Sequence, residues 1–427
     1  MIKNVYFTWM EAYVGVLNYA IPFFLILIFF ESWIGHVKGK IVMRSMDTLA
    51  SLISGVTNVF KDVLGLTVII VSYDWMVGNL RLVQIQETWV IYLVAFIGLD
   101  FSGYWVHRIS HKINYFWNHH LIHHSSEEFN LGCALRQSIS NWFSISFVFL
   151  LPTALLGVPA QVISFIAPLH LFSQYWYHTK LIGKLGFLEY ILVTPSHHRV
   201  HHAINDIYID KNLSQIFIFW DKIFGTFQEE LVNEPPVYGV KKPVKSWNPF
   251  VINFIHLWQL LQDAWRAKSW YDKLVIWVKP TGWRPKDVAE AYPIQLTESV
   301  YDQLKYDPDY PLIFHVWCWF QWACISIISL IFFNYAAEIG YQILIYFGGF
   351  MYLSIASMTL LMDKHWSAIY VEMIKNIIAL VAVFFYRDWF MLHSSLVMGP
   401  ALIATYHILC MFMTGYYYNI FRSEIPA

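Results

Sequence analysis

The stretch TWVIYLVAFIGLDFSGYWVHRISHKINYFWNHHLIHH, residues 88–124, joins a membrane-like segment to a run of histidines. Its first 19 residues, Thr88–Val106, are apolar except for Asp100 and are long enough to cross a bilayer. Eight histidines follow, here and further along the chain, in three groups with helical spacing: His107 and His111; His120, His123 and His124; His198, His201 and His202. We therefore predict an all-α membrane protein with a metal site beside its spans.

The spacing within each histidine group places its members on one side of a helix. Positions i, i+3 and i+4 project the same way, so each group presents two or three imidazoles together. Neutral imidazole suits iron, zinc, copper and nickel, and a structural zinc needs only four ligands. Eight histidines therefore predict two adjacent metals. His178, at the end of another apolar segment and at a similar depth, is a candidate ninth ligand.

The composition identifies the chain as an integral membrane protein. Hydrophobic residues make up 57% of it and charged residues 13%, and its mean hydropathy is +0.46. The net charge of -1 and the absence of a basic run give no sign of nucleic acid. The four cysteines are widely spaced and form no C-x-x-C pair, so we expect reduced packing residues.

Uncharged or nearly uncharged segments predict eight or nine membrane spans in a polytopic helical bundle. One pair of spans lies within residues 137–177 and turns at Gly157-Val158-Pro159. The remaining predicted spans are Ala12–Phe30, Val63–Leu80, Thr88–Val106, Pro311–Ala337, Ile339–Met362, a segment around Glu372 and Lys375, and Trp389–Phe421.

Lysine and arginine residues predict the orientation of the spans. Lys38, Lys40 and Arg44 follow the first span and belong in the cytoplasm by the positive-inside rule. Counting spans from there places all three histidine groups on the cytoplasmic face. Residues 178–310, also cytoplasmic by this count, hold 15 of the 28 Lys and Arg residues, which agrees with the rule. The C-terminal Glu424–Ala427 carries no retention signal, so endoplasmic reticulum and bacterial inner membrane both remain open.

The spans divide the chain into four expected parts. Residues 1–87 form N-terminal spans, 88–230 a catalytic domain, 231–310 a Trp-rich interfacial linker and 311–427 C-terminal spans. Within the linker, Val251, Phe254, Trp258, Leu261 and Trp265 recur at steps of three and four. This pattern predicts an amphipathic helix that lies either in the membrane interface or against the protein itself.

Three polar residues are candidates for supporting the metal site. Asp100 lies two helical turns before His107, so we expect it to orient that histidine, with Arg108 or a cytoplasmic lysine as the alternative partner. Gln174 precedes His178 by four residues and should face the same cavity. Glu127, directly after the second histidine group, is expected to bond to a metal-bound histidine, although a ligand or a solvated charge is also possible.

The other histidines do not fit the metal pattern. His119 and His197 each precede a group but break its spacing, so we expect supporting or structural roles. The scattered remainder are expected to be hydrogen-bonded core residues: His36, His170, His256, His315, His365, His393 and His407.

The three histidine groups around an apolar hairpin resemble the fatty acid hydroxylase and sterol desaturase superfamily of membrane di-iron oxygenases. Longer strings are similar to the alkylglycerol monooxygenase branch of that superfamily, over about residues 88–230. These strings are Asp100-x3-Tyr104-Trp105-x-His107-Arg108, His123–Glu127 through Asn130, Ala134–Ser138, Thr194–His202, Asp210-Lys211-Asn212 and Trp220–Phe227.

The resemblance implies hydroxylation of the ether-bearing carbon of a glyceryl ether lipid. It implies two iron ions (Fe2+/Fe3+), O2 and tetrahydrobiopterin, with a fatty aldehyde and a glycerol derivative as products, and a pterin-recycling enzyme or redox protein as partner. The chain departs from the pattern at Ala203-Ile204, where Gly-Arg is usual, and at Leu213-Ser214, where a Tyr-containing pair is usual. These departures leave the lipid and the reductant open, and no segment forms a pterin motif.

Two other functions compete with this one. A sterol desaturase or fatty acid hydroxylase would take electrons from a redox protein instead of a pterin. A multi-span haem protein or metal transporter would belong to a different class. Haem would require paired histidines within spans and transport would require polar residues through the bilayer, whereas the histidine groups cluster beyond span ends.

Overall fold

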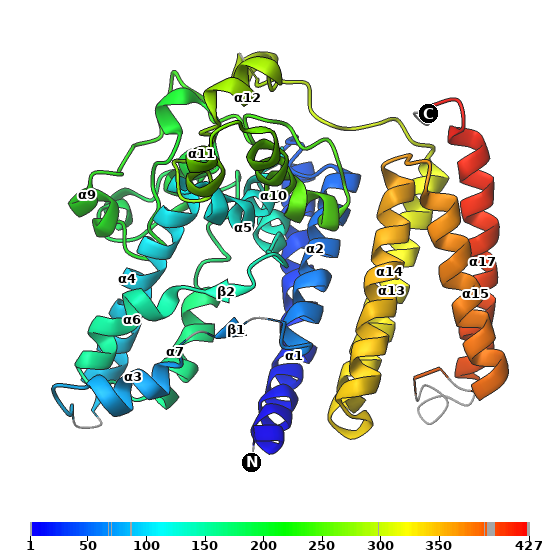
Figure 1. Cartoon of the computed structure of the whole chain (residues 1–427), viewed down its shortest axis with the longest axis horizontal. Coiled ribbons are helices and arrows are strands. Elements are labelled where there is room, and N and C mark those ends of the chain that lie inside the picture. Colours follow the sequence, from blue (N-terminus) through cyan, green and yellow to red (C-terminus); the bar gives the residue numbers. More distant parts are fainter. Residues whose placement is uncertain are drawn as a thin grey trace.

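A computed structural model describes residues 2–66, 68–69, 71–85, 88–297, 299–387, 389–390 and 398–424. This part of the chain is almost entirely helical (Figure 1). Its single sheet is a parallel pair of two-residue strands, β1 (Val68–Ile69) and β2 (Phe143–Ser144), in which Val68 pairs with Phe143. The predicted helical class is confirmed.

Four helices form the N-terminal part and the entry to the first histidine group. They are α1 (Ile2–Val37), α2 (Ser45–Val63), α3 (Tyr73–Leu80) and α4 (Trp89–Lys112). The predicted span Val63–Leu80 is wrong as a single helix, because α2 ends at Val63 and α3 has only 8 residues. The predicted span Thr88–Val106 lies within α4, which continues past His107 and His111.

The apolar hairpin follows the second histidine group. That group lies on α5 (Asn114–His124), and the hairpin consists of α6 (Ser146–Leu155) and α7 (Ala160–Phe172). After a loop come α8 (Pro195–His201), which carries most of the third group, and α9 (Phe219–Phe224). The predicted turn lies between α6 and α7, where Gly157 has φ +73 and a Cβ would approach the Val83 carbonyl oxygen to 2.1 Å. Helices of 10 and 13 residues extend only about 15–20 Å, so neither alone spans a bilayer core.

The linker helices are α10 (Pro249–Arg266), α11 (Trp270–Val275) and α12 (Lys286–Ala291). Asn248 caps α10 by accepting hydrogen bonds from the backbone N–H groups of Phe250 and Val251, and Pro249 occupies the first helical position. The predicted amphipathic helix is therefore present. It packs on α5, the helix that carries the second histidine group.

The C-terminal part contains α13 (Leu312–Ile339), α14 (Tyr341–Met362), α15 (Ala368–Tyr386) and α17 (Gly399–Phe421). These helices pack on one another and, through α13 and α14, on α2. The resulting core includes Phe60, Phe314, Phe347 and Tyr417, all almost fully buried. His393 lies outside the described residues.

Five helices of the described chain are long and apolar enough to cross a membrane. They are Gly15–Val37, Trp89–Lys112, Leu312–Tyr335, Tyr341–Met362 and Ala368–Tyr386. The chain is therefore a multi-pass membrane protein. Figure 1 shows α10, α11 and α12 at one end of the bundle, together with the C-terminus, while the N-terminus lies at the opposite end.

Candidate metal centre

The histidines from all three sequence groups converge into two clusters. One contains His107, His111, His120, His124 and His201, and the other contains His123, His178, His198 and His202. Within each cluster, one ring nitrogen from every histidine lies within 4.8 Å of the others. The predicted second group is thus split between the clusters, because adjacent His123 and His124 project to different sides of α5.

The distances between ring nitrogens fit metal ligation. The Nε2 atoms of His107 and His120 are 2.9 Å apart, and those of His120 and His124 are 3.0 Å apart. Two nitrogens at about 2.1 Å from one metal and at right angles to each other would be about 3.0 Å apart. The Nε2 atoms of His111 and His201 are buried without a hydrogen-bond partner. These atoms are therefore free to bind a metal ion.

His178 belongs to the second cluster. Its Nε2 atom lies 2.8 Å from that of His198, and His198 Nε2 lies 3.1 Å from His202 Nε2. His178 donates its Nδ1 proton to the backbone carbonyl of Gln174, at 3.1 Å. This bond fixes the tautomer and leaves Nε2 as the donor atom for a metal. The residues therefore fit two metal ions, one in each cluster.

A short loop orients three histidines of the first cluster. His107 donates from Nδ1 to the carbonyl of Leu213 at 2.7 Å, and His201 donates from Nδ1 to the carbonyl of Lys211 at 3.0 Å. His111 Nδ1 lies 3.2 Å from the carboxylate of Asp210. All three contacts occupy Nδ1, so the Nε2 atoms turn toward the cluster centre.

This loop has a strained backbone that buried side chains hold in place. Asp210 and Asn212 both have positive φ, 57 and 51, which non-glycine residues rarely adopt. Asn212 donates to the carbonyls of His197 and Gln228. The carboxylate of Asp221 accepts from the backbone N–H groups of Leu213 and Ser214, at 2.7 and 2.9 Å. Sequence reasoning missed this arrangement, since carbonyl acceptors leave no mark in a sequence.

The predicted contact between Asp100 and His107 is wrong. Asp100 accepts from His170 Nε2 at 2.9 Å and from Trp220 Nε1 at 2.9 Å. It also accepts from the backbone N–H groups of Ile216 and Phe217. Asp100 therefore clamps the segment that follows the histidine-orienting loop, instead of contacting a clustered histidine. Arg108 does not pair with it either, and binds the hydroxyl of Tyr104 and the carbonyl of Phe224.

Gln174 meets its predicted neighbour only through the backbone. Its carbonyl accepts from His178, but its side-chain amide donates to Gln215 Oε1 and the carbonyl of His170, both at 3.3 Å. Its side-chain oxygen accepts from Tyr177 at 3.4 Å. The expectation that the side chain faces the His178 cavity is therefore wrong, because it turns toward the Asp100 clamp.

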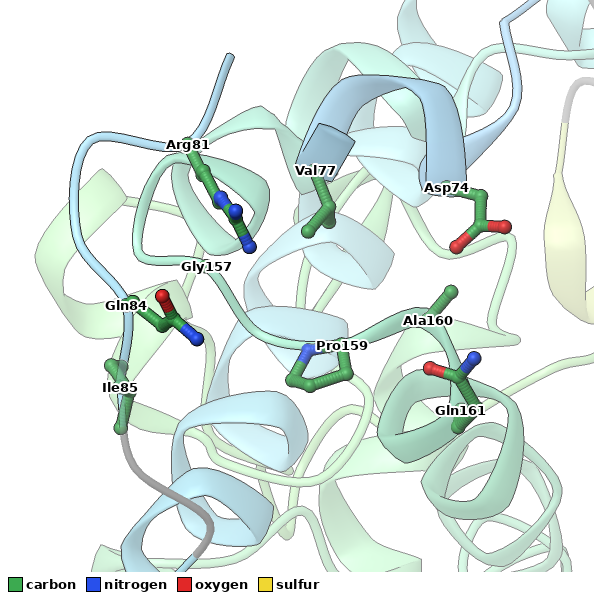
Figure 2. A pocket seen from close by; sticks show the side chains of 9 residues that line it. All are labelled: Asp74, Val77, Arg81, Gln84, Ile85, Gly157, Pro159, Ala160 and Gln161. Atoms are coloured by element: carbon green, nitrogen blue, oxygen red, sulfur yellow. The ribbon is translucent and has the colours of Figure 1, made fainter. Parts of the chain in front are cut away.

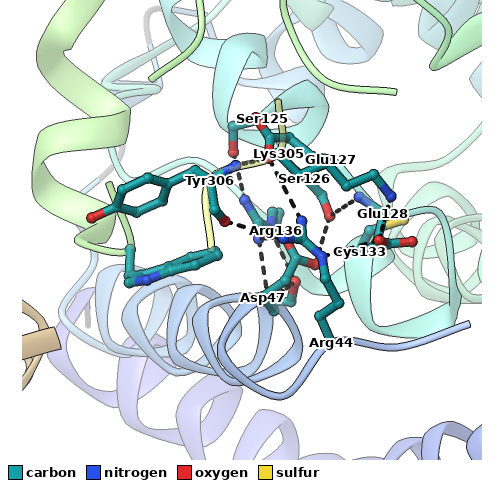
Figure 3. Close-up of polar contacts among 12 residues, drawn as sticks. Arg44, Asp47, Ser125, Ser126, Glu127, Glu128, Cys133, Arg136, Lys305 and Tyr306 are labelled. Atoms are coloured by element: carbon teal, nitrogen blue, oxygen red, sulfur yellow. Dashed lines mark hydrogen bonds and ion pairs between the residues drawn. The ribbon is translucent and has the colours of Figure 1, made fainter. Parts of the chain in front are cut away.

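Glu127 also lies away from the histidines. Its carboxylate accepts from the backbone N–H of Tyr306 at 2.6 Å, and Arg44 is 3.6 Å away (Figure 3). Its neighbour Glu128 binds Arg44, Lys180 and Lys305. The expected bond to a metal-bound histidine is wrong. Glu127 and Glu128 instead hold the segment at residues 303–306 in place next to the residues that follow α5.

A buried ion pair completes this network. Arg136 lies 2.8 Å from Asp47, and both side chains are 2% exposed. Arg136 also donates to Ser51 and Ser125, and Ser126 donates to the other oxygen of Asp47 (Figure 3). The network ties α2 to the residues that directly follow His123 and His124.

Burial keeps the clustered imidazoles neutral. It lowers the pKa of His178 to about 4 and the pKa values of His120, His198 and His202 well below the ordinary value of 6.5, with neighbouring histidines adding to the effect at His120. Neutral imidazole is the form that binds metal. At pH 7 these side chains are therefore ready to act as ligands without losing a proton.

Two histidines beside the groups have the structural roles expected of them. His197 completes the capping box at the start of α8, where Thr194 is the capping residue. His119 packs against the rings of Tyr115 and Phe116. Neither belongs to a cluster.

A polar cleft lies beside the turn between α6 and α7. It has a volume of about 640 Å³ and is lined by Asp74, Arg81, Gln84, Gly157 and Gln161, among others (Figure 2). None of its lining residues belongs to a histidine cluster. The cleft is therefore separate from the metal centre.

The model of the fatty acid hydroxylase family matches residues 92–226, which hold all nine clustered histidines. This region of the chain is therefore similar to fatty acid hydroxylases. Histidine rings within each cluster lie with centroids mostly 4.2–5.5 Å apart, which leaves no slot for a porphyrin between them. The clusters are thus not spaced to hold a haem between two of their histidines.

Relatives extend the similarity beyond this region. Alkylglycerol monooxygenase from Homo sapiens is 40% identical over 271 residues, which cover 62% of this chain and 59% of the relative. The enzyme of that name from Xenopus tropicalis is 36% identical over 292 residues, 68% of this chain and 64% of the relative. Methylsterol monooxygenase 1-3 from Arabidopsis thaliana is 26% identical over 231 residues, which cover 48% of this chain and 72% of the relative.

The resemblance inferred from the histidine groups and the longer strings is confirmed by these matches. The chain spans about three fifths of the length of the alkylglycerol monooxygenases that it matches. No solved structure is detectably similar to it.

Proposed function

We propose that this chain is a membrane di-iron monooxygenase that hydroxylates a lipid, with the ether carbon of an alkylglycerol as the favoured target. The reaction would consume O2 and tetrahydrobiopterin and release a fatty aldehyde and a glycerol derivative. The convergence of nine histidines, six of them buried, in two adjacent clusters carries the proposal. The names of the relatives that are 36–40% identical favour the alkylglycerol substrate over a sterol.

Each histidine cluster would hold one iron ion. The ligands of one iron would be His107, His111, His120, His124 and His201, and those of the other would be His123, His178, His198 and His202. Imidazole is a suitable ligand for iron. When bound, the two iron ions would supply the redox chemistry that activates dioxygen.

The protein's own residues would fix and enclose this site. The carbonyls of Lys211 and Leu213, with the Asp210 carboxylate, hold ring orientation through Nδ1. Phe129 and Tyr177 lie against the rings of the second cluster, at centroid distances of 5.9 and 5.1 Å from His178. These apolar surfaces exclude water and suit a lipid substrate.

The histidine side of the bundle is proposed to face the cytoplasm, because Lys38, Lys40 and Arg44 follow the first span and residues 178–310 hold 15 of the 28 Lys and Arg residues. The membrane would be the endoplasmic reticulum in a eukaryote or the inner membrane in a bacterium. The proposed parts of the chain are the N-terminal spans (1–87), the catalytic domain (88–230), the interfacial linker (231–310) and the C-terminal spans (311–427). The proposed partner is a pterin-recycling enzyme or a redox protein.

The experiment compares two substrate and reductant pairs on the purified chain in lipid nanodiscs. An alkylglycerol with tetrahydrobiopterin should yield fatty aldehyde, whereas a methylsterol with NADPH and a redox protein should not react. Iron analysis should find two iron ions per chain. Turnover of the sterol pair alone would overturn the substrate proposal, and a preparation that is active without iron would overturn the metal centre.

A further inference from the structure

The amphipathic helix α10 turns its apolar side outward. Asn253 and Asp263 are completely buried, and Asp263 receives two bonds from Arg284. By contrast, Trp258 is 61% exposed and Trp265 is 85% exposed. A helix on a water-soluble surface would bury the tryptophans and expose the aspartate, so this helix is inverted relative to that pattern.

Exposed apolar residues also lie on α11 and just after it, and α11 contacts the end of α10, where Lys273 donates to the carbonyl of Trp265. We call the combined surface the docking face, and it consists of exposed residues of both segments: Val251, Trp258, Leu261, Trp265, Trp270, Tyr271, Leu274 and Val278. It contains three tryptophans, a residue type enriched at membrane interfaces. A contiguous apolar surface of this kind marks an interaction site.

The docking face adjoins the start of the apolar hairpin. Phe254, between Val251 and Trp258 in the apolar pattern, packs against Trp142 at a centroid distance of 5.7 Å. Trp142 and Phe143 are exposed and lead into α6, the first helix of the apolar hairpin. The apolar surface therefore runs from the hairpin to α10 without a polar break at this contact.

Basic residues alternate with the apolar residues of the docking face in the segment from the end of α10 to just after α11. Residues 266–279 contain four basic residues, Arg266, Lys268, Lys273 and Lys279, and one acidic residue, Asp272. The ammonium groups of Lys273 and Lys279 lie over the rings of Trp270 and Trp283, 5.4 and 5.6 Å from their centroids. Tryptophan and lysine side by side are the combination that binds an anionic membrane surface.

We propose that the docking face lies in the headgroup layer of the membrane leaflet on the histidine side, and that anionic lipids strengthen this attachment. The tryptophans and leucines enter the acyl boundary, while the lysines and arginine reach phosphate groups. This role is independent of the metals and of the reaction.

The attachment has a consequence for the histidines. The backbone N–H of Leu257 donates to Asn118 at 2.9 Å, and His256 donates to the carbonyl of Asn114 at 3.0 Å. These bonds join α10 to α5, which carries His120, His123 and His124. A docked α10 therefore sets the height of the histidine clusters above the leaflet.

The test measures depth in the full chain reconstituted in nanodiscs. An environment-sensitive fluorophore is attached to Leu274→Cys on α11 or Leu261→Cys on α10, which keep all tryptophans. The control is Glu290→Cys on α12, where the native side chain is exposed. Lipids with brominated acyl chains should quench the first two labels and leave the third unaffected.

A second arm tests the charges. Phosphatidylglycerol added to phosphatidylcholine should increase the quenching, and the double change Lys268→Glu and Lys279→Glu should remove that increase. Each lysine should strengthen the binding of the docking face to the anionic surface roughly fivefold. The proposal is overturned if the labels at 261 and 274 are quenched no more than the label at 290. It is also overturned if they become shielded only when two copies of the chain associate, which would make the face a dimer interface.

Discussion

The carboxylate of Asp210 lies 3.2 Å from Nδ1 of His111 and 2.6 Å from the ammonium group of Lys112. One acidic side chain thus orients a candidate metal ligand and neutralises the next residue along α4. The backbone of Asp210 is held at φ 57, which places its side chain on the histidine cluster while the next carbonyl, of Lys211, faces His201.

We predict that Asp210→Ala lowers iron affinity or kcat by roughly 10- to 100-fold, because His111 loses the partner that fixes its tautomer. KM for the lipid should change little. Asp210→Asn, which keeps an acceptor oxygen, should recover part of the loss. Asp206→Ala is the matched control, since Asp206 is 91% exposed and pairs only with Lys241 in the described structure. Equal effects of the two Ala variants on iron content would contradict this role.

The ninth histidine can be tested separately from its neighbours. His178→Ala should reduce bound iron from two ions per chain toward one, because the second cluster would keep only three ligands. Activity should fall at least about 100-fold, since loss of a ligand should exceed the effect of losing an orienting partner. His119→Ala, which removes a histidine outside both clusters, should keep its iron and its activity. Full iron content in His178→Ala would remove His178 from the ligand set.

Asp100 should matter for stability more than for metal binding. Its removal leaves His170, Trp220 and two backbone N–H groups without their buried acceptor. We expect Asp100→Ala to cost about 3–5 kcal/mol of unfolding free energy, as for a broken buried pair. Thermal unfolding in detergent measures this, with Asp74→Ala as an exposed control. If stability were unchanged while iron was lost, the direct role in orienting His107 would be restored.

The sequence predicted what depends on spacing and composition. Helical spacing identified the eight grouped histidines, and the apolar length of Thr88–Val106 predicted the helix that presents His107. The sequence did not predict the orienting loop, because its acceptors are the backbone carbonyls of Lys211 and Leu213, and every residue type has a backbone carbonyl. Asp100 and Glu127 were misread because distance along a helix says nothing about which loop folds back to meet a carboxylate. The short lengths of α6 and α7 were also not predicted, because an uncharged stretch of sequence indicates apolar surroundings and not the length of a helix.

Glu127 provides a test of the fastened segment at residues 303–306. Glu127→Ala should leave iron content unchanged and expose this segment to protease, because the backbone N–H of Tyr306 loses its acceptor. Glu127→Gln retains an acceptor oxygen and should resist cleavage nearly as well as the unchanged chain. Limited proteolysis followed by mass spectrometry locates the cut. A loss of iron in Glu127→Gln would instead support the original expectation that Glu127 bonds to a clustered histidine.

Acid should destabilise the metal-free protein over a defined range of pH. Burial lowers the pKa values of His178 and His256 to about 4, whereas in the unfolded chain both titrate near 6.5. Below about pH 6.5 the unfolded chain takes up protons that the folded chain does not, so the stability present at neutral pH declines as the pH falls toward 4. Each histidine contributes up to about 3 kcal/mol to this decline.

His256 isolates one part of that decline, because it lies outside both clusters and donates to the carbonyl of Asn114. His256→Gln can make the same donation without titrating, so its unfolding free energy should depend less steeply on pH than that of the unchanged chain. Chemical unfolding of both chains with a chelator present, between about pH 7 and pH 5, measures the two slopes. Identical slopes would mean that His256 is already protonated in the folded chain or stays neutral in the unfolded one, and the burial argument would fail at this residue.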